Sequence, residues 1–136
     1  MAVVVELIRK EEGGAISFGN HTLENKAKLE DFEYNGDLYK VKTYKTMTKL
    51  EKNGMFVYES VPGTSVVGFI EDEEGIRFTV EGNEDAQITV ELEEDAEYEV
   101  FVAGESIGKM KTNLGGKLNI STQLAEAGEV EVRILK

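Results

Sequence analysis

The fold is decided by the stretch Phe32-Glu33-Tyr34-Asn35-Gly36-Asp37-Leu38-Tyr39-Lys40-Val41-Lys42-Thr43-Tyr44. Its centre, Asn35-Gly36, is the strongest short signal for a β-hairpin, because both central positions of the tightest hairpin turn need a positive φ. The residues after this turn alternate between the two faces of a strand, as they do when one face is buried. A second pair, Asn53-Gly54, lies between two further strand-like segments. Two such hairpins in one short region predict an antiparallel β-meander.

Period-two alternation also occurs at the start of the chain and through its second half. Strands with one buried face and one solvent face build antiparallel sheets that pack as a sandwich. Residues 23–29 and 123–127 could each form a short helical turn. We predict an all-β protein, an antiparallel meander followed by a β-sandwich-like part, with about ten or eleven strands and minimal helix. The apolar positions of these other expected strands are Val3, Val5 and Leu7; Ile76, Phe78 and Val80; Ile88, Val90 and Leu92; Tyr98, Val100 and Val102; Leu118 and Ile120; and Val130, Val132 and Ile134.

The composition excludes several classes of function. A net charge of −12 over 136 residues argues against nucleic acid and membranes as partners, because phosphates are bound through Lys and Arg. The absence of Cys removes disulfides, thiolate metal sites and cysteine nucleophiles. No motif predicts a cofactor or a metal, and no stretch approaches the roughly 20 apolar residues of a membrane span. The first residues lack the order of a signal peptide, so we expect a cytoplasmic protein, with unconventional export left open.

The charge is unevenly distributed along the chain. Residues 1–62 carry nine basic and ten acidic side chains, whereas residues 63–136 carry six and 17, for net charges of −1 and −11. The change falls near the only proline, Pro62. We therefore predict two regions, an N-terminal β-meander over 1–62 and an acidic β-sandwich-like part over 63–136.

Four residues of one expected strand form the candidate ligand-binding group: Tyr39, Lys40, Lys42 and Tyr44. Lys40 and Lys42 share one strand face, and Tyr44 continues that face. A positive stripe beside aromatic rings can hold an anion, a sugar acid or the acidic surface of a protein. The alternatives are a sheet edge protected by lysines, or a stripe that pairs with the acidic region within one molecule or between copies. Pairing with the acidic region is the alternative we favour.

Two other features could carry chemistry. The runs Glu71-Asp72-Glu73-Glu74 and Glu93-Glu94-Asp95 hold carboxylates of the kind that bind calcium, but their spacing is not that of a calcium loop, which favours solvated turns. His21 is the only histidine and could act as a general base, although a single residue forms no catalytic group. The stretch Asn20-His21-Thr22 is more simply a turn.

Two resemblances to known families add expectations. Over nearly the whole chain, and most clearly at residues 35–43, 53–64 and 108–117, the sequence resembles a group of short bacterial proteins labelled endosialidase β chain. That resemblance implies sialic-acid chemistry or a subunit associated with it. Residues 97–118 also resemble the last strands of fibronectin-III-like and carbohydrate-binding sandwiches of bacterial enzymes. The shared features are a Tyr-x-Val strand, a glycine hairpin, a Thr and a Gly-Gly turn.

The residues supply no catalytic set, which favours binding over chemistry. Our first hypothesis is a non-enzymatic binding or assembly module that contacts a protein partner, or another copy of itself, through its sheet surfaces. The second is a subunit that binds an acidic carbohydrate through Tyr39, Lys40, Lys42 and Tyr44. The third, which the resemblance implies, is a component of an endosialidase-type glycoside hydrolase.

Overall fold

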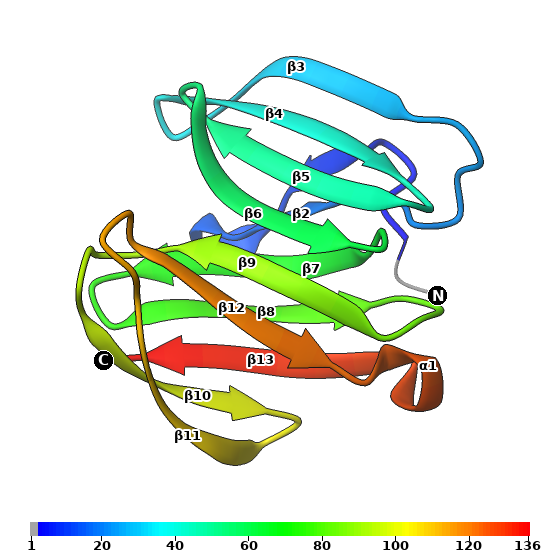
Figure 1. Ribbon diagram of the computed structural model, residues 1–136. Coiled ribbons are helices and arrows are strands. Elements are labelled where there is room, and N and C mark those ends of the chain that lie inside the picture. The colour runs from blue at the N-terminus through cyan, green and yellow to red at the C-terminus, as the bar shows by residue number, and fades with distance from the viewer. Residues whose placement is uncertain (1–2) are drawn as a thin grey trace.

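A computed structural model describes residues 3–136 as two antiparallel β-sheets, one of seven strands and one of six, with one short α-helix (Figure 1). The prediction of an all-β fold is confirmed. The elements are β1 (Ile8–Lys10), the 3-10 turn η1 (Glu12–Gly14), β2 (Ile16–Phe18), β3 (Ala27–Tyr34), β4 (Asp37–Tyr44), β5 (Met47–Lys52), β6 (Met55–Val61), β7 (Ser65–Asp72), β8 (Gly75–Glu81), β9 (Ala86–Glu91), β10 (Glu97–Val102), β11 (Glu105–Lys111), β12 (Lys117–Thr122), α1 (Leu124–Ala127) and β13 (Glu129–Leu135).

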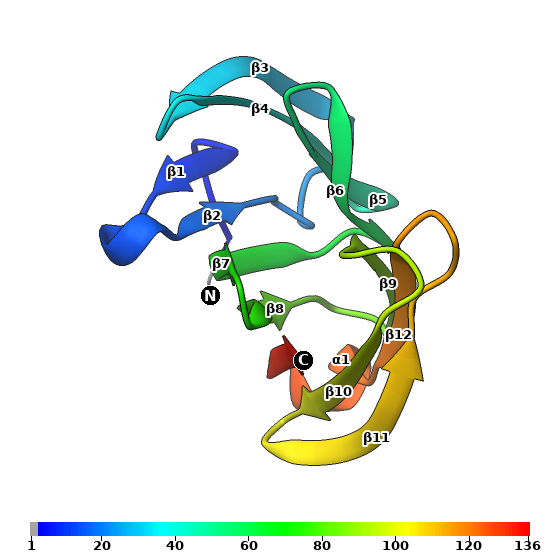
Figure 2. The same cartoon turned by 90° about the vertical axis from the view of Figure 1, so that its left-hand side faces the viewer.

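The strand order confirms the meander. In the six-stranded sheet the order is β12-β9-β6-β5-β4-β3, so β3 to β6 follow one another in space as they do in sequence. The seven-stranded sheet has the order β1-β2-β7-β8-β13-β10-β11. Two views related by 90° place β3 and β4 at one end of the molecule and β10 and β11 at the other (Figure 2).

Both Asn-Gly turns form as the sequence predicts. Asn35 and Gly36 have φ values of 53° and 82°, and Asn53 and Gly54 have 53° and 78°. These left-handed conformations are open to Asn and Gly at little cost, which is why the pair selects a two-residue hairpin. The turns join β3 to β4 and β5 to β6.

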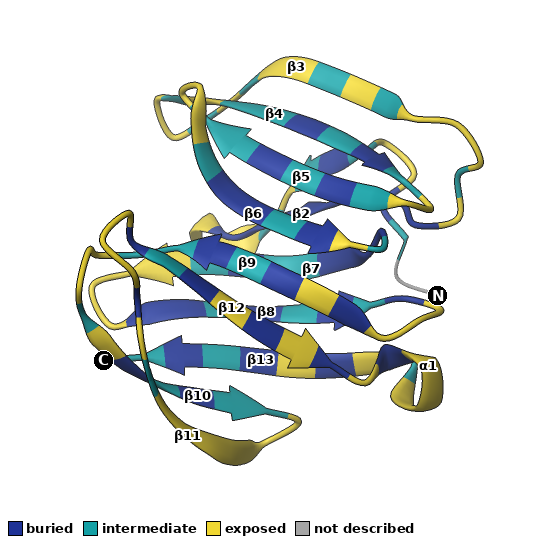
Figure 3. Ribbon diagram, viewed as in Figure 1, coloured by how far each residue is buried: buried dark blue, intermediate teal, exposed yellow. Residues whose placement is uncertain are grey.

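One core lies between the sheets, and the expected alternation fills it. Buried residues alternate with half-buried or exposed ones along many of the strands, such as β5, β8, β12 and β13 (Figure 3). Ile76, Phe78 and Val80 of β8 are all buried, as predicted. Phe18 and Tyr58 pack edge to face with ring centroids 5.2 Å apart, and Phe69 and Phe78 extend this aromatic cluster. Such contacts add stabilisation beyond the burial of apolar area.

Strands from both sides of Pro62 share each sheet. β6 pairs with β9 in the six-stranded sheet, and β2 pairs with β7 in the seven-stranded sheet. The same core cluster contains residues from both sequence regions, such as Val41 and Ile88. The division of the chain into 1–62 and 63–136 remains a prediction from charge.

Two expected elements are corrected by the structure. The first strand begins only at Ile8, because Leu7 has a φ of 73° and its N–H donates to the carbonyl oxygen of Val4 in a turn. Val5, expected in that strand, is 79% exposed, and Met1 and Ala2 lie outside the described residues. No helix forms over residues 23–29: residues 23–26 are an irregular bend, and residues 27–29 already belong to β3.

Two expectations remain, one about the second short helix and one about the number of strands. The short helix expected over residues 123–127 is confirmed as α1. The described residues hold thirteen strands rather than ten or eleven. β1 and β2 have three residues each, too few for alternation to reveal them.

A buried network of hydroxyl groups surrounds the crossing from β6 to β7. The Thr64 hydroxyl lies 2.7 Å from both the Tyr58 hydroxyl and the Ser60 hydroxyl. The Thr48 hydroxyl donates to the Thr64 carbonyl oxygen at 2.7 Å and accepts from the Thr64 N–H at 3.1 Å. Thr43 extends the network at 2.8 Å from the Thr48 hydroxyl. Because all five residues are shielded from water, each partner that is lost leaves an unsatisfied polar group.

Thr64→Val is therefore expected to lower the free energy of unfolding by about 1–3 kcal/mol, since valine keeps the shape but removes the buried hydroxyl that Tyr58 and Ser60 both contact. Urea denaturation measures this loss. The control is Thr79→Val, the same change on β8, where the hydroxyl makes no hydrogen bond within residues 3–136; it should change stability by no more than about 0.5 kcal/mol. Equal effects of the two substitutions would show that the network does not stabilise the crossing.

Candidate functional site

The outer face of the six-stranded sheet carries a line of three lysines on neighbouring strands. Lys28 of β3 lies opposite Lys42 of β4, and Lys42 lies opposite Lys49 of β5. We call these three residues the lysine row. Their side chains point away from the core, because the alternating neighbours Val41 and Thr43 are buried. Directly opposed residues have Cβ atoms about 4.5–5.5 Å apart, so like charges placed there repel.

Two members of the lysine row form no ion pair in the described part of the chain, although Lys49 lies opposite Glu59 of β6 in the register. Within residues 3–136, no carboxylate oxygen lies within 4.0 Å of the ammonium group of Lys42 or of Lys49. Lys28 has one, at 3.0 Å in Glu30, and that pair is exposed to solvent. The Lys49 ammonium lies 5.9 Å from the ring centroid of Phe56. The row therefore keeps net positive charge in a protein that is otherwise strongly acidic.

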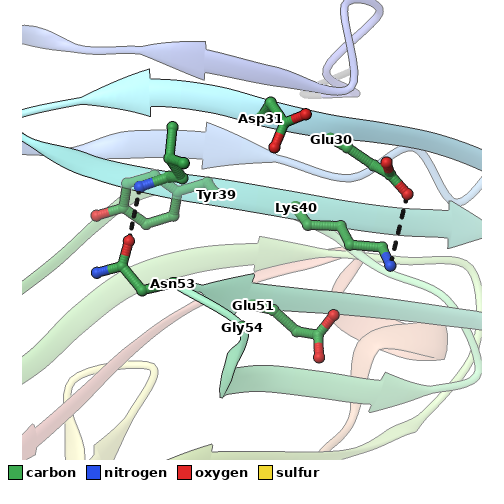
Figure 4. A pocket seen from close by; sticks show the side chains of 8 residues that line it. Glu30, Asp31, Tyr39, Lys40, Glu51, Asn53 and Gly54 are labelled. Carbon is green, nitrogen blue, oxygen red and sulfur yellow. Dashed lines mark hydrogen bonds and ion pairs between the residues drawn. The ribbon is translucent and has the colours of Figure 1, made fainter.

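The neighbouring line of residues on the same face is balanced in charge. Lys40 lies 3.6 Å from Glu30 of β3 and opposite Glu51 of β5. Figure 4 shows Lys40 between these two carboxylates, beside a surface hollow of about 290 Å³ that Asp31 also lines. Lys40 is thus compensated within the molecule, whereas Lys42, two residues further along β4, is not.

The structure divides the four residues that the sequence predicts as a site. Lys40, Lys42 and Tyr44 lie on the outer face of β4, and the Lys26 ammonium lies 5.7 Å from the Tyr44 ring centroid. Tyr39 lies on the opposite face and packs against the core. Its burial, and then the nearby carboxylates of Asp37 and Glu71, raise the pKa of the Tyr39 hydroxyl. The Tyr39 side chain therefore leaves β4 on the face opposite to the other three, although Tyr39 and Lys40 both line the hollow of Figure 4.

Sequence reasoning missed Lys28 as part of this site. A hairpin with an uninterrupted register from the Asn35-Gly36 turn would place Lys28 opposite Thr43, which is buried. A bulge between Leu29 and Phe32, where Asp31 has a φ of 57°, shifts the register by one residue. Lys28 is thereby brought opposite Lys42. The pairing of Lys42 with Lys49 follows from the short turn between β4 and β5 and could have been found.

The two acidic runs are partly neutralised by basic side chains. Asp72 lies 2.7 Å from Arg77 on the β7–β8 hairpin. Glu93 lies 2.6 Å from Lys136, and Asp95 lies 3.0 Å from Lys111. In the described part of the chain, no three His, Asp or Glu residues are grouped so that they could hold a metal ion. These contacts favour the interpretation of both runs as charged turns.

His21 forms a buried contact with a serine. Its Nδ1 atom lies 2.7 Å from the Ser65 hydroxyl, which also accepts from the His21 backbone N–H at 3.3 Å. His21 is only 3% exposed and Ser65 is fully buried, so no substrate can reach the pair. The Nε2 atom has no hydrogen-bond partner within residues 3–136. Burial lowers the pKa of His21, and the carboxylate of Glu81 opposes this shift.

Comparison with known proteins gives no family for the chain. No family model matches it, no curated protein is significantly similar, and no solved structure matches. Within the part of the chain that the structure describes, no helix is long and apolar enough to cross a membrane.

The lowered pKa of His21 predicts that the protein loses stability in mild acid. Below about pH 6.5, the ordinary pKa of the group, the unfolded chain takes up a proton that the buried native ring resists, so the unfolded state is favoured. Urea unfolding between pH 8 and pH 5 should show this loss in the native sequence. His21→Gln cannot titrate in this range and should lack that component; parallel stability curves for the two proteins would contradict the prediction.

Proposed function

We propose that this protein is a non-enzymatic binding or assembly module that holds the acidic surface of a protein partner on its lysine row. One observation carries the proposal: Lys42 lies between Lys28 and Lys49 on an open sheet face, and neither Lys42 nor Lys49 forms an ion pair within residues 3–136. Lys49 has a carboxylate opposite it in the register, that of Glu59, whereas both residues opposite Lys42 are lysines. Opposed like charges destabilise a sheet, by up to about 1 kcal/mol per pair. Arrangements that break a local rule without an internal gain are expected at functional sites.

The size of the lysine row suits a single acidic patch. Neighbouring strands lie about 4.8 Å apart, so the three lysines span about 10 Å. At physiological salt the Debye length is about 8 Å, and the charges of the row act on a bound anion nearly together. Carboxylates placed above Lys42 and Lys49 would relieve the repulsion that the free protein carries. Binding of this kind is expected to weaken as salt increases.

A second copy of the chain supplies an acidic surface of the required kind. Residues 63–136 have a net charge of −11. Exposed Glu129 and Glu131 lie on β13, in the other sheet from the lysine row. Contact between the lysine row of one copy and the acidic sheet of the next would be heterologous, and such contacts form rings or open chains.

An acidic carbohydrate is the second candidate partner. Tyr44 lies on the same outer face as Lys42, so an aromatic ring and an unpaired ammonium group are both available to a sugar acid. This candidate agrees with what the resemblance to endosialidase β chain implies. A hydrolytic role would in addition need catalytic groups, and it rests on the resemblance alone.

Light scattering after size exclusion, over a series of salt concentrations, tests the proposal. We expect a larger mass at low salt that falls toward the monomer as salt increases. The variant Lys42→Glu/Lys49→Glu should remain monomeric at every salt concentration. The matched control Lys109→Glu/Lys111→Glu makes the same change in charge on β11, outside the row, and should still associate.

If the protein is a monomer at all salt concentrations, external partners are tested next. Polyglutamate and a sialic-acid oligomer are then titrated into the native protein and both variants. Binding of polyglutamate that only the row variant loses would support an acidic protein partner. Binding of the sugar alone, again lost only in the row variant, would replace the protein partner by the carbohydrate. Absence of self-association and of both ligands would overturn the proposal.

A further inference from the structure

The two sheets end in β11 and β12, at the end of the molecule away from β3 (Figure 1). Residues of both strands line a groove there. It has a volume of about 620 Å³, within the range of sites that hold ligands. Its apolar lining includes Val102 at the end of β10, Ala127 of α1 and Val130 of β13. Ile107 of β11 also lines the groove and is 53% exposed. The groove thus exposes apolar surface beside two sheet edges.

The edge strand β12 is open to pairing with another strand. β12 pairs with β9 on one side, without interruption from Lys117 to Thr122, and it is the last strand of its sheet. Its free side therefore presents backbone N–H and C=O groups that no further strand of the sheet satisfies. β11 ends the other sheet but is protected, because the β10–β11 pair contains a bulge and β11 carries exposed charges.

The groove also carries unpaired negative charge. Glu105 of β11 and Glu126 of α1 line it. Within residues 3–136, neither carboxylate makes an ion pair or a side-chain hydrogen bond. A partner with apolar side chains and basic groups would therefore be complementary to the groove in both respects.

We propose that this groove binds an extended polypeptide segment of alternating apolar and basic residues, which adds as a strand to the free edge of β12. Main-chain hydrogen bonds to the edge would provide affinity, and pockets for alternate side chains would provide specificity. A segment matching the six residues of β12 spans about 20 Å. Apolar side chains on one face of the segment would lie toward Val102, Ile107 and Val130, and the long basic side chains of the other face would have to bend around the strand to reach Glu105 and Glu126. This site is separate from the lysine row and takes a partner of opposite charge.

A fluorescent octapeptide that alternates valine and lysine is the probe for this site, with fluorescence anisotropy as the readout. We expect saturable binding with one site per chain. Methylation of alternate amide nitrogens keeps charge and apolar character but removes main-chain donors, and it should abolish binding. Hydrogen exchange of the amides of residues 117–122 should become slower when the unmethylated peptide is bound, because the free edge is then paired.

Three variants locate the interaction. Glu105→Gln/Glu126→Gln should weaken binding roughly fivefold to tenfold, as expected for the loss of two partly exposed ion pairs. Glu84→Gln/Glu94→Gln removes two exposed charges elsewhere and should change the dissociation constant less than about twofold. Lys42→Glu/Lys49→Glu should still bind the peptide, which separates this site from the lysine row. Equal binding of the methylated peptide, or unchanged exchange at residues 117–122, would overturn the proposal.

Discussion

The fold depends on the hydrogen bonds around Thr64, which fix the chain where it crosses from one sheet to the other. At this residue the chain leaves the six-stranded sheet after β6 and enters the seven-stranded sheet at β7. The Thr64 hydroxyl and backbone bind Tyr58, Ser60 and Thr48, so the crossing is fixed to two strands of the first sheet. The preceding residue, Gly63, passes so close to the carbonyl oxygen of Tyr44 that a Cβ atom would collide with it. Since a buried network is stabilising only when all its members are satisfied, this crossing tolerates little change.

Because the crossing is fixed, the outer face of β3, β4 and β5 can hold like charges next to one another without losing its structure. The core side of β4 is buried through Val41 and Thr43, which sets the direction of Lys42 on the other side. The repulsion within the lysine row, up to about 1 kcal/mol for each opposed pair, is small beside the burial of the core. A sheet can therefore hold three lysines in line, ready for an acidic partner. Natural proteins commonly retain such local costs where binding requires them.

The sequence allowed the fold to be predicted better than the site. The Asn35-Gly36 and Asn53-Gly54 turns, with the alternation in β8 and β13, were sufficient for the all-β architecture because these signals are local. The site depends on register between strands. A single bulge at Asp31 brings Lys28 opposite Lys42, and no local sequence pattern predicts this bulge. Tyr39 is next to Lys40 in sequence, but alternation along β4 directs its side chain to the core. The groove beside β12 is lined by consecutive elements from β10 to β13, and its shape depends on how they pack, which alternation does not give.

The stability of Lys42→Gln tests the central claim most directly, because glutamine removes the charge and keeps most of the side chain. If the lysine row is repulsive, the Lys42→Gln variant should be more stable than the native protein at about 10 mM salt. Its free energy of unfolding should be higher by about 0.2–1 kcal/mol. At 1 M salt, where the Debye length is about 3 Å, the gain should disappear. Lys109→Gln, which removes a charge near Glu97, should show no gain. A Lys42→Gln protein that is no more stable than the native one at low salt would contradict the account.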